Sequence, residues 1–304
     1  MRIATKIPGI EALTLKEPFF IHNIRLFPIT GEIGHDGFTT LEEGIFSKEI
    51  VIEDTRGVNE VTIRNLGEQQ FFAIDGEEII GARQNRILNT DVYIEPHREY
   101  TVPVTCIEQH RWSGGQTFAE AGFAVTPSLR STLALSVNAS LNQKKGFVSN
   151  QSLIWSKIEN TLKSTRISSM TSSFHDVYKT LGDMVNELME GFDSIKDAVG
   201  FAAFINDRFI AMDIFASNSL YQKFEKKLLK SYILDGYIRK YTREQGISIS
   251  PDSIIKNIAN TDCKTFNSPT KGTELRGISE GIIVKAYLLE ENPLHISAFA
   301  IAGE

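Results

Sequence analysis

The stretch "VYIEPHREYTVPVTCIE", residues 92–108, has the pattern of a strand, a short turn and a second strand. In its second half, Val102, Val104 and Cys106 occupy every other position. Successive side chains of a strand point to opposite faces, so this alternation predicts a strand with one face directed to a core. The stretch therefore predicts a β-sheet in this part of the chain.

Further strands are predicted on the N-terminal side of this pair. The segments are rich in β-branched and aromatic residues and are separated by Gly, Asn, Asp and Pro turn signals. Several short strands at close spacing indicate a sandwich or a half-open barrel, without deciding between the two. The predicted strands cover residues 20–28, 49–53, 60–65, 71–74 and 86–94.

Beyond residue 112 the pattern changes to a mixture of helices and strands. Residues 113–126 are rich in small side chains and are predicted to form a loop. Thr126 before Pro127 is a typical N-cap and first-turn pair, which predicts the start of a helix. The helices are expected at 127–141, 150–163, 174–190 and 217–244, and the strands at 200–206, 208–216, 272–278, 281–289 and 294–301.

These patterns together predict an α+β protein. We expect a β-rich lobe at residues 1–125 that carries the polar motif described below. The mixed helix and sheet half then occupies residues 126–304, and one continuous domain is the alternative. A chain of 304 residues can bury a sizeable core in either arrangement.

The composition indicates a globular protein, since 41% of the residues are hydrophobic and 23% are charged. A net charge of -6 argues against general nucleic-acid binding. No apolar run approaches the roughly 18 residues that span a membrane, and the first residues lack the apolar centre of a secretory signal. We therefore expect a cytoplasmic protein with no nucleic-acid or membrane partner. Nothing in the composition predicts an oligomeric state.

The stretch "DGEEIIGARQNRI", residues 75–87, places many charged and amide side chains between two apolar runs. A second polar group follows in "CIEQHRW", residues 106–112, where Glu108 lies at the rim of the apolar strand face. A carboxylate buried alone costs several kcal/mol, so Glu108 needs a cation. The candidates nearby in the sequence are Arg83, Arg86 and Arg111. The cluster is either a buried ion pair that fixes the strand register or a ligand pocket.

Each polar side chain suits a particular role in such a pocket. Arginine holds phosphate or carboxylate with a planar fork, and the neutral amides can bind the polar edge of a base, ribose or amide. The tryptophan can stack on a base, or it can be an ordinary core or rim residue. The predicted ligand-binding residues are Arg83, Gln84, Asn85, Arg86, Arg111 and Trp112.

The carboxylates of the cluster are the candidates for chemistry. Glu77 and Glu108 are the predicted catalytic residues. Glu77, Glu78 and Glu108 are the predicted ligands of a divalent cation, for which Mg²⁺ is the candidate. Cys106 has no evident histidine partner and is not predicted to be a nucleophile. His175 has an ordinary packing or surface explanation.

The residues "FFAIDGEEIIGARQNRILNTDVYIEP" (71–96) and "TVPVTCIEQHRW" (101–112) resemble the central motif of a bacterial protein family. It is the ARG and rhodanese-phosphatase-superfamily-associated protein domain family, in which ARG abbreviates ADP-ribosylglycohydrolase. Weaker similarity extends over most of the chain, at residues 127–133, 150–159, 197–206 and 212–232.

The resemblance implies a role near ADP-ribose or NAD-derived metabolites, because the family is named after its gene neighbours and fusion partners. It assigns no activity and no catalytic residue. The leading hypothesis is a hydrolase of a nucleotide-like metabolite. In it Glu108 or Glu77 activates water, directly or through Mg²⁺, and Arg83 and Arg86 hold phosphate. The alternatives are a protein that binds or senses such an anionic small molecule without turnover, and a structural or assembly protein.

Overall fold

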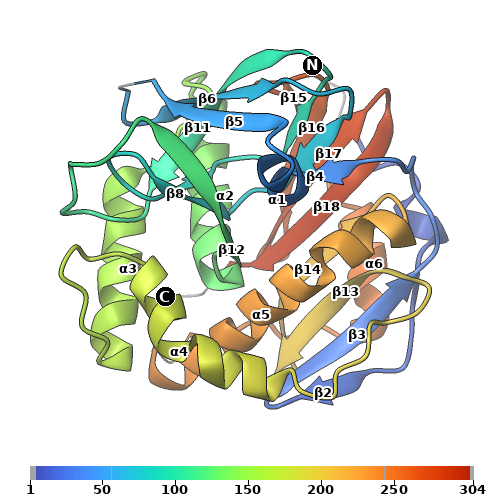
Figure 1. The fold of residues 1–304 in the computed structure, drawn as a ribbon. Coiled ribbons are helices and arrows are strands. Elements are labelled where there is room, and N and C mark those ends of the chain that lie inside the picture. Colours follow the sequence, from blue (N-terminus) through green and yellow to red (C-terminus); the bar gives the residue numbers. More distant parts are fainter. Residues whose placement is uncertain (1–4, 56, 243, 302–304) are drawn as a thin grey trace. The chain divides into compact units, whose positions relative to one another are not determined.

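The computed structural model describes residues 5–55, 57–242 and 244–301. Within them the chain divides into two units, whose elements are drawn in Figure 1. Both units contain helices and strands, which confirms the predicted α+β class. The first unit comprises Met1–Gly37, Glu187–Ser268 and Gly272–Glu304, and the second comprises Phe38–Asn186 and Pro269–Lys271.

Among the described residues of the second unit, six antiparallel strands close into a barrel in the order β11-β6-β5-β12-β8-β9. Apolar side chains fill the barrel, among them Ile52, Ile79 and Val104. The alternation predicted for residues 102–106 is thus confirmed, with Val102 and Val104 in the core. The strands are β5 (Ile50–Asp54), β6 (Glu60–Asn65), β8 (Glu77–Gly81), β9 (Arg86–Leu88), β11 (Glu99–Cys106) and β12 (Thr117–Ala124).

A short sheet and several helices complete the second unit. The sheet has the order β10 (Val92–Ile94), β7 (Phe71–Ala73) and β4 (Thr39–Thr40). An isolated bridge pairs Glu108 with Ser173, so the residues after β11 lie beside the start of α4. The helices are α1 (Leu41–Phe46), α2 (Pro127–Asn142), α3 (Gln151–Thr165) and α4 (His175–Leu188).

One antiparallel sheet forms the framework of the first unit, in the order β1-β3-β13-β14-β18-β17-β16-β15, with β2 paired to β3. The α5 helix (Asn218–Thr242) packs against β13 and β14. The α6 helix (Pro251–Ala259) and the 3-10 helix η1 (Ile10–Ala12) contribute to the apolar core with the sheet. The strands are β1 (Thr14–Leu15), β2 (Phe19–Ile21), β3 (Ile24–Thr30), β13 (Ala198–Ile205), β14 (Arg208–Phe215), β15 (Cys263–Asn267), β16 (Thr273–Ser279), β17 (Ile282–Leu289) and β18 (Asn292–Ala300).

Local signals in the sequence account for most of these elements. The α2 helix begins at Pro127 directly after Thr126, as predicted. The hairpin between β13 and β14 turns at Asn206 and Asp207, whose φ values of 49° and 57° suit a type I′ turn. The α3, α4 and α5 helices and the three C-terminal strands also lie close to their predicted positions.

The predicted loop at 113–126 is wrong for most of its length, because it contains β12. Its alanines and glycine have low strand propensity, but pairing with β5 and β8 overrides that preference. Two predicted strands, 20–28 and 86–94, are each divided into two strands. The α1 and α6 helices were not predicted, although a capping box at Thr40 and a Ser250–Pro251 pair mark their starts.

The predicted boundary between residues 125 and 126 falls inside the second unit, between β12 and α2. The chain leaves the first unit after Gly37 and returns to it at Glu187. β3, which precedes the first crossing, pairs with β13, which follows the second. Pairing between strands so far apart in the sequence leaves no signal in composition.

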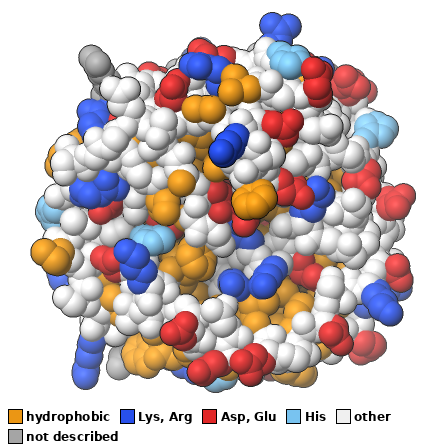
Figure 2. All heavy atoms as spheres, viewed as in Figure 1, with side chains coloured by type: hydrophobic (Ala, Val, Ile, Leu, Met, Phe, Trp, Pro, Cys, Tyr) orange, Lys and Arg blue, Asp and Glu red, His pale blue; other side chains and the backbone are white. Residues whose placement is uncertain are grey.

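The surface carries charges of both signs. Figure 2 shows acidic and basic side chains interspersed over the face that it presents. None of the helices in the described part of the chain has the length and apolar character of a transmembrane segment.

Candidate functional site

The polar stretch 75–87 forms β8, the turn after it and β9 in the barrel wall. Arg86 is the cross-strand partner of Ile79 on one side and of Cys106 on the other. Ile79 belongs to the barrel core, so Arg86 and Cys106 also face inward. Glu78 precedes Ile79 and faces outward, because strand residues alternate. The stretch therefore contributes polar groups to both faces of the wall.

On the inner face, Asp54 at the end of β5 binds two arginines. Arg83 donates to it from Nε at 2.7 Å and from Nη2 at 3.0 Å, and Arg86 donates from Nη2 at 3.3 Å. The side chains of Asp54 and Arg86 are 4% and 1% exposed, whereas that of Arg83 is 32% exposed. Both predicted phosphate-binding arginines thus bind Asp54, and neither binds Glu108.

Arg86 is enclosed by the barrel wall. Its Nη1 donates to the Glu60 carbonyl at 3.0 Å, and its Cζ lies 5.3 Å from the centre of the Phe118 ring. Among the described residues, its Nε has no hydrogen-bond partner. The neighbouring Cys106 thiol donates to the Val58 carbonyl at 3.6 Å. Burial raises the pKa of Cys106, so the thiol stays protonated and is a poor nucleophile.

Glu108 lies beyond the end of β11, bridged to Ser173, and three residues hold its carboxylate. Its Oε2 accepts hydrogen bonds from the Asn85 N–H at 3.1 Å and from Arg111 Nε at 2.8 Å, and its Oε1 accepts one from Thr171 at 2.9 Å. Burial opposes ionisation, but the bonds from Arg111, Asn85 and Thr171 outweigh it and lower the pKa of Glu108. The predicted pairing of Glu108 with an arginine is confirmed for Arg111, at 2.7 Å from Nη2.

Arg111 and the two amide side chains also hold the turn between β8 and β9. Arg111 donates to the Ala82 carbonyl at 2.8 Å and to Asn85 Oδ1 at 2.9 Å. Gln84 donates from Nε2 to the Glu108 carbonyl at 2.7 Å. Its Oε1 is buried and has no partner among the described residues. These three predicted ligand-binding residues therefore bind other parts of the chain.

Glu78 and His175 form a carboxylate–imidazole pair on the outer face. His175 is the first residue of α4, and its Nδ1 lies 3.1 Å from Oε2 of Glu78. The Glu78 side chain is 0% exposed and the His175 side chain is 14% exposed. Within the described chain, neither Oε1 of Glu78 nor Nε2 of His175 has a hydrogen-bond partner. The pair thus keeps one acceptor and one ring nitrogen available.

The surroundings of this pair favour proton binding. Burial raises the pKa of Glu78, and the hydrogen bond and charge of His175 offset only part of that effect. The hydrogen bond with Glu78 raises the pKa of His175 more than burial lowers it. The charge of Glu108 also raises the pKa of Glu78, whereas Lys179 lowers it. The pair therefore holds a proton more firmly than isolated side chains would.

The stability contributed by the Glu78–His175 pair is expected to fall as the pH rises. The pKa of His175 is higher in the folded protein than its ordinary value of 6.5, so the pair stabilises the fold fully below pH 6.5. This stabilisation is lost as the pH rises through the folded-state pKa. The raised pKa of Glu78 acts in the same direction. We expect the difference in the free energy of unfolding between wild type and an E78Q/H175Q double variant to shrink as the pH rises above about 6.5. Urea unfolding at several pH values measures it, and a difference that grows with pH contradicts the raised pKa values.

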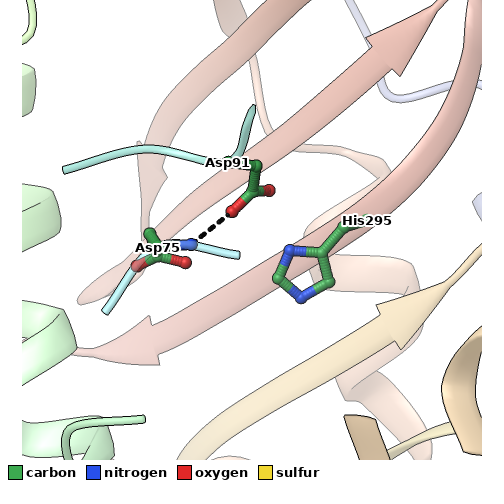
Figure 3. A group of neighbouring side chains, drawn as sticks. All are labelled: Asp75, Asp91 and His295. Carbon is green, nitrogen blue, oxygen red and sulfur yellow. Dashed lines mark hydrogen bonds between the residues drawn. The ribbon is translucent and has the colours of Figure 1, made fainter. Parts of the chain in front are cut away.

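Asp75 and Glu77 bind the chain around them. Arg130 of α2 and Asp75 form a buried ion pair, with 2.8 Å between Nη2 and Oδ1. The N–H of Asp75 donates to Oδ1 of Asp91 at 2.8 Å (Figure 3). Glu77 accepts a hydrogen bond from the backbone N–H three residues before it at 3.0 Å. Gly76 has a φ of 79°, and a Cβ there would lie 2.7 Å from Arg130 Cγ, so this turn requires glycine.

Comparison with known proteins places the chain in a family. A family model described as the ARG and Rhodanese-Phosphatase-superfamily-associated Protein domain, ARPP-1, matches residues 12–299. The chain belongs to the ARPP-1 family. The resemblance carried by residues 71–96 and 101–112 is thus confirmed. No curated protein and no solved structure matches the chain.

The predicted metal site of this ARPP-1 protein requires three carboxylates to converge, because the oxygens that bind one cation lie close together. In the described chain, the carboxylate oxygens of Glu77, Glu78 and Glu108 do not all lie within 4.8 Å of one another. Their carboxylates bind a backbone N–H, His175 and Arg111, respectively. Binding of Mg²⁺ by these three residues therefore stays a prediction without geometric support.

Trp112 is the one predicted ligand-binding residue with a largely exposed side chain, at 56%. Three residues of the site, Asp54, Thr171 and His175, lie outside the predicted set. Strand alternation could have found Asp54, because Ile50, Ile52 and Asp54 occupy the same side of β5. No such signal existed for His175, which is 97 positions from Glu78 and lies on a helix.

Proposed function

We propose that this ARPP-1 protein is a hydrolase that acts on a small, nucleotide-like metabolite at the outer face of the barrel wall. The proposal rests on two interacting carboxyl groups whose pKa values shift in opposite directions. The pKa of Glu78 is raised and that of Glu108 is lowered. Two titratable groups whose surroundings push their pKa values apart are the usual basis of an acid and a base in one enzyme.

In the proposed reaction, the Glu78–His175 pair is the general acid. The raised pKa values of Glu78 and His175 favour a proton on the pair, and His175 is its partly exposed member. His175 donates this proton from Nε2 to the leaving group, while Glu78 holds the ring through Nδ1 and stabilises its charged form.

Glu108 is the ionised partner in this scheme. Arg111, Thr171 and Asn85 hold its carboxylate in one orientation. The attacking water gives one proton to Glu108 and adds its oxygen to the substrate, and the bond to the leaving group breaks as that group takes the proton of His175. Glu77, the other predicted base, has no role here because its carboxylate binds the backbone.

The description of the family supports a substrate related to ADP-ribose or NAD, because it names an association with ARG proteins. Such a substrate carries phosphate groups. Lys179 lies one helical turn after His175 on α4, is exposed and influences the pKa of both members of the pair. It therefore supplies a cation for a phosphate beside the proposed acid.

Ligand binding without turnover is the second candidate function. It is favoured by the burial of Glu108, which is 5% exposed and has both carboxylate oxygens engaged in hydrogen bonds. A carboxylate in that condition accepts a proton from water poorly. The same cluster would then recognise an anionic metabolite through Lys179 and the protonated Glu78–His175 pair.

A ligand panel tests the proposed function. ADP-ribose, NAD, AMP and ribose 5-phosphate are incubated with the protein, with and without Mg²⁺, and melting temperature and product formation are both measured. Binding adds RT ln(1 + [L]/Kd), about 2.7 kcal/mol at a hundredfold excess over Kd, so millimolar ligand reveals even micromolar affinity. We expect one member to raise the melting temperature and to be hydrolysed. Binding without product decides for the second candidate, and a panel with no effect contradicts both.

A further inference from the structure

Arg83, at the inner rim of the barrel, presents a hydrogen-bonding edge that no described residue uses. Asp54 binds its Nε and Nη2, and Nη1 has no partner in the described chain. The side chain is 32% exposed. The Nη1–Nη2 edge of a guanidinium group has the planar geometry that binds two oxygens of a phosphate.

The charges around Arg83 are unbalanced. Asp54 is the only carboxylate in the described chain that Arg83 or Arg86 contacts. Arg64 shows the opposite arrangement on the same barrel, because it binds two carboxylates, Glu53 and Glu99. Two guanidinium groups that share one carboxylate leave a positive charge beside a buried arginine, and such a charge is stabilised by an anion.

The loop between β11 and β12 lies directly against this turn. A Cβ at Gly114 would lie 1.6 Å from the carbonyl oxygen of Ala82, the residue before Arg83, so only glycine fits there. Residues 113–115 are exposed, and their backbone N–H groups make no hydrogen bond within the described chain. Backbone N–H groups of a glycine-rich turn are common ligands of phosphate.

We propose that Arg83 and the backbone N–H groups of residues 113–115 form a binding site for a phosphate-type oxyanion at the inner rim of the barrel. The anion receives hydrogen bonds from the open edge of Arg83 and from the loop, and its charge balances Arg83 and Arg86. The site does not include Glu78 or His175, but Arg111 connects its loop to Glu108, because Arg111 donates to the Ser113 carbonyl at 3.1 Å and to Glu108 at 2.8 Å. Anion binding at this site does not require the proposed hydrolysis.

Titration with defined probes tests this site. Inorganic phosphate, AMP and uncharged adenosine are titrated into the wild-type protein and into R83Q by calorimetry. We expect phosphate or AMP to bind the wild type and R83Q to weaken that binding by at least about tenfold, since it removes the charge and one planar fork. If AMP binds and inorganic phosphate does not, the site recognises a phosphate group only as part of a larger ligand. If both bind, the oxyanion alone is sufficient for binding.

The matched control is R64Q, which removes an arginine of the same barrel that is already balanced by Glu53 and Glu99. Its affinity for the probes should equal that of the wild type. R83K keeps the charge and provides a second variant if R83Q does not fold; its affinity should fall between those of the wild type and R83Q. Absence of phosphate and AMP binding at millimolar concentrations overturns the proposal, as does equal affinity in the wild type and the Arg83 variants.

Discussion

Replacing Asp54 by asparagine is expected to lower the free energy of unfolding by about 3–5 kcal/mol. The substitution keeps the shape of the side chain and removes the carboxylate that Arg83 and Arg86 share, at 2.7 Å and 3.3 Å. Arg86 is 1% exposed, so water cannot replace the lost charge. A buried cation without a counter-charge is among the most destabilising changes available to a folded protein. Urea unfolding of the variant measures the loss.

The control for this experiment is E53Q, because Glu53 precedes Asp54 on β5 and also pairs with an arginine. Its side chain is 41% exposed and lies 2.8 Å from Arg64. Exposed ion pairs contribute less than about 1 kcal/mol, so E53Q should change stability little. If D54N and E53Q destabilise the protein equally, the inner cluster is solvated and the structural role assigned to Asp54 is wrong.

The elements that could be predicted from the sequence are those with strong local signals. The alternation at Val102 and Val104, the Thr126–Pro127 pair and the Asn206–Asp207 turn each determine local conformation through the residues involved. Pairing of β3 with β13 joins segments that are far apart in the chain, and no local pattern specifies it. The division into units and the strand β12 both depend on such distant pairing.

The site shows the same distinction between near and distant contacts. The need of a buried carboxylate for a cation was enough to predict that Glu108 pairs with Arg83, Arg86 or Arg111, and the partner is Arg111, three positions away. The sequence also indicated that the polar cluster is either an ion-pair network or a ligand pocket, and the structure shows ion pairs within it. Gln84, Asn85 and Arg111 bind the chain, whereas Glu78, His175 and Arg83 retain groups without a partner in the described residues.

Loss of the proposed acid is expected to give the largest effect on turnover. In H175Q and in E78Q, kcat for the substrate found in the ligand panel should fall by roughly 10²–10⁴-fold. H175Q removes the group that donates the proton, and E78Q removes the carboxylate that holds the ring at 3.1 Å and raises the pKa of His175. E108Q should lower kcat as well, because an amide cannot accept the proton of the attacking water.

The pH profile separates a catalytic role of the pair from a structural one. An acid that must be protonated makes kcat/KM fall as the pH rises through its pKa, and the wild-type fall should lie above pH 6.5 because the pKa of His175 is raised from that value. In E78Q the main cause of the raised pKa is gone, so the residual activity should fall at lower pH than in the wild type. The control is H97Q, which removes an exposed histidine 3.0 Å from Glu68 and should leave both kcat and the profile unchanged. An E78Q profile that coincides with the wild-type profile, or an H175Q variant with normal kcat, removes the pair from the mechanism.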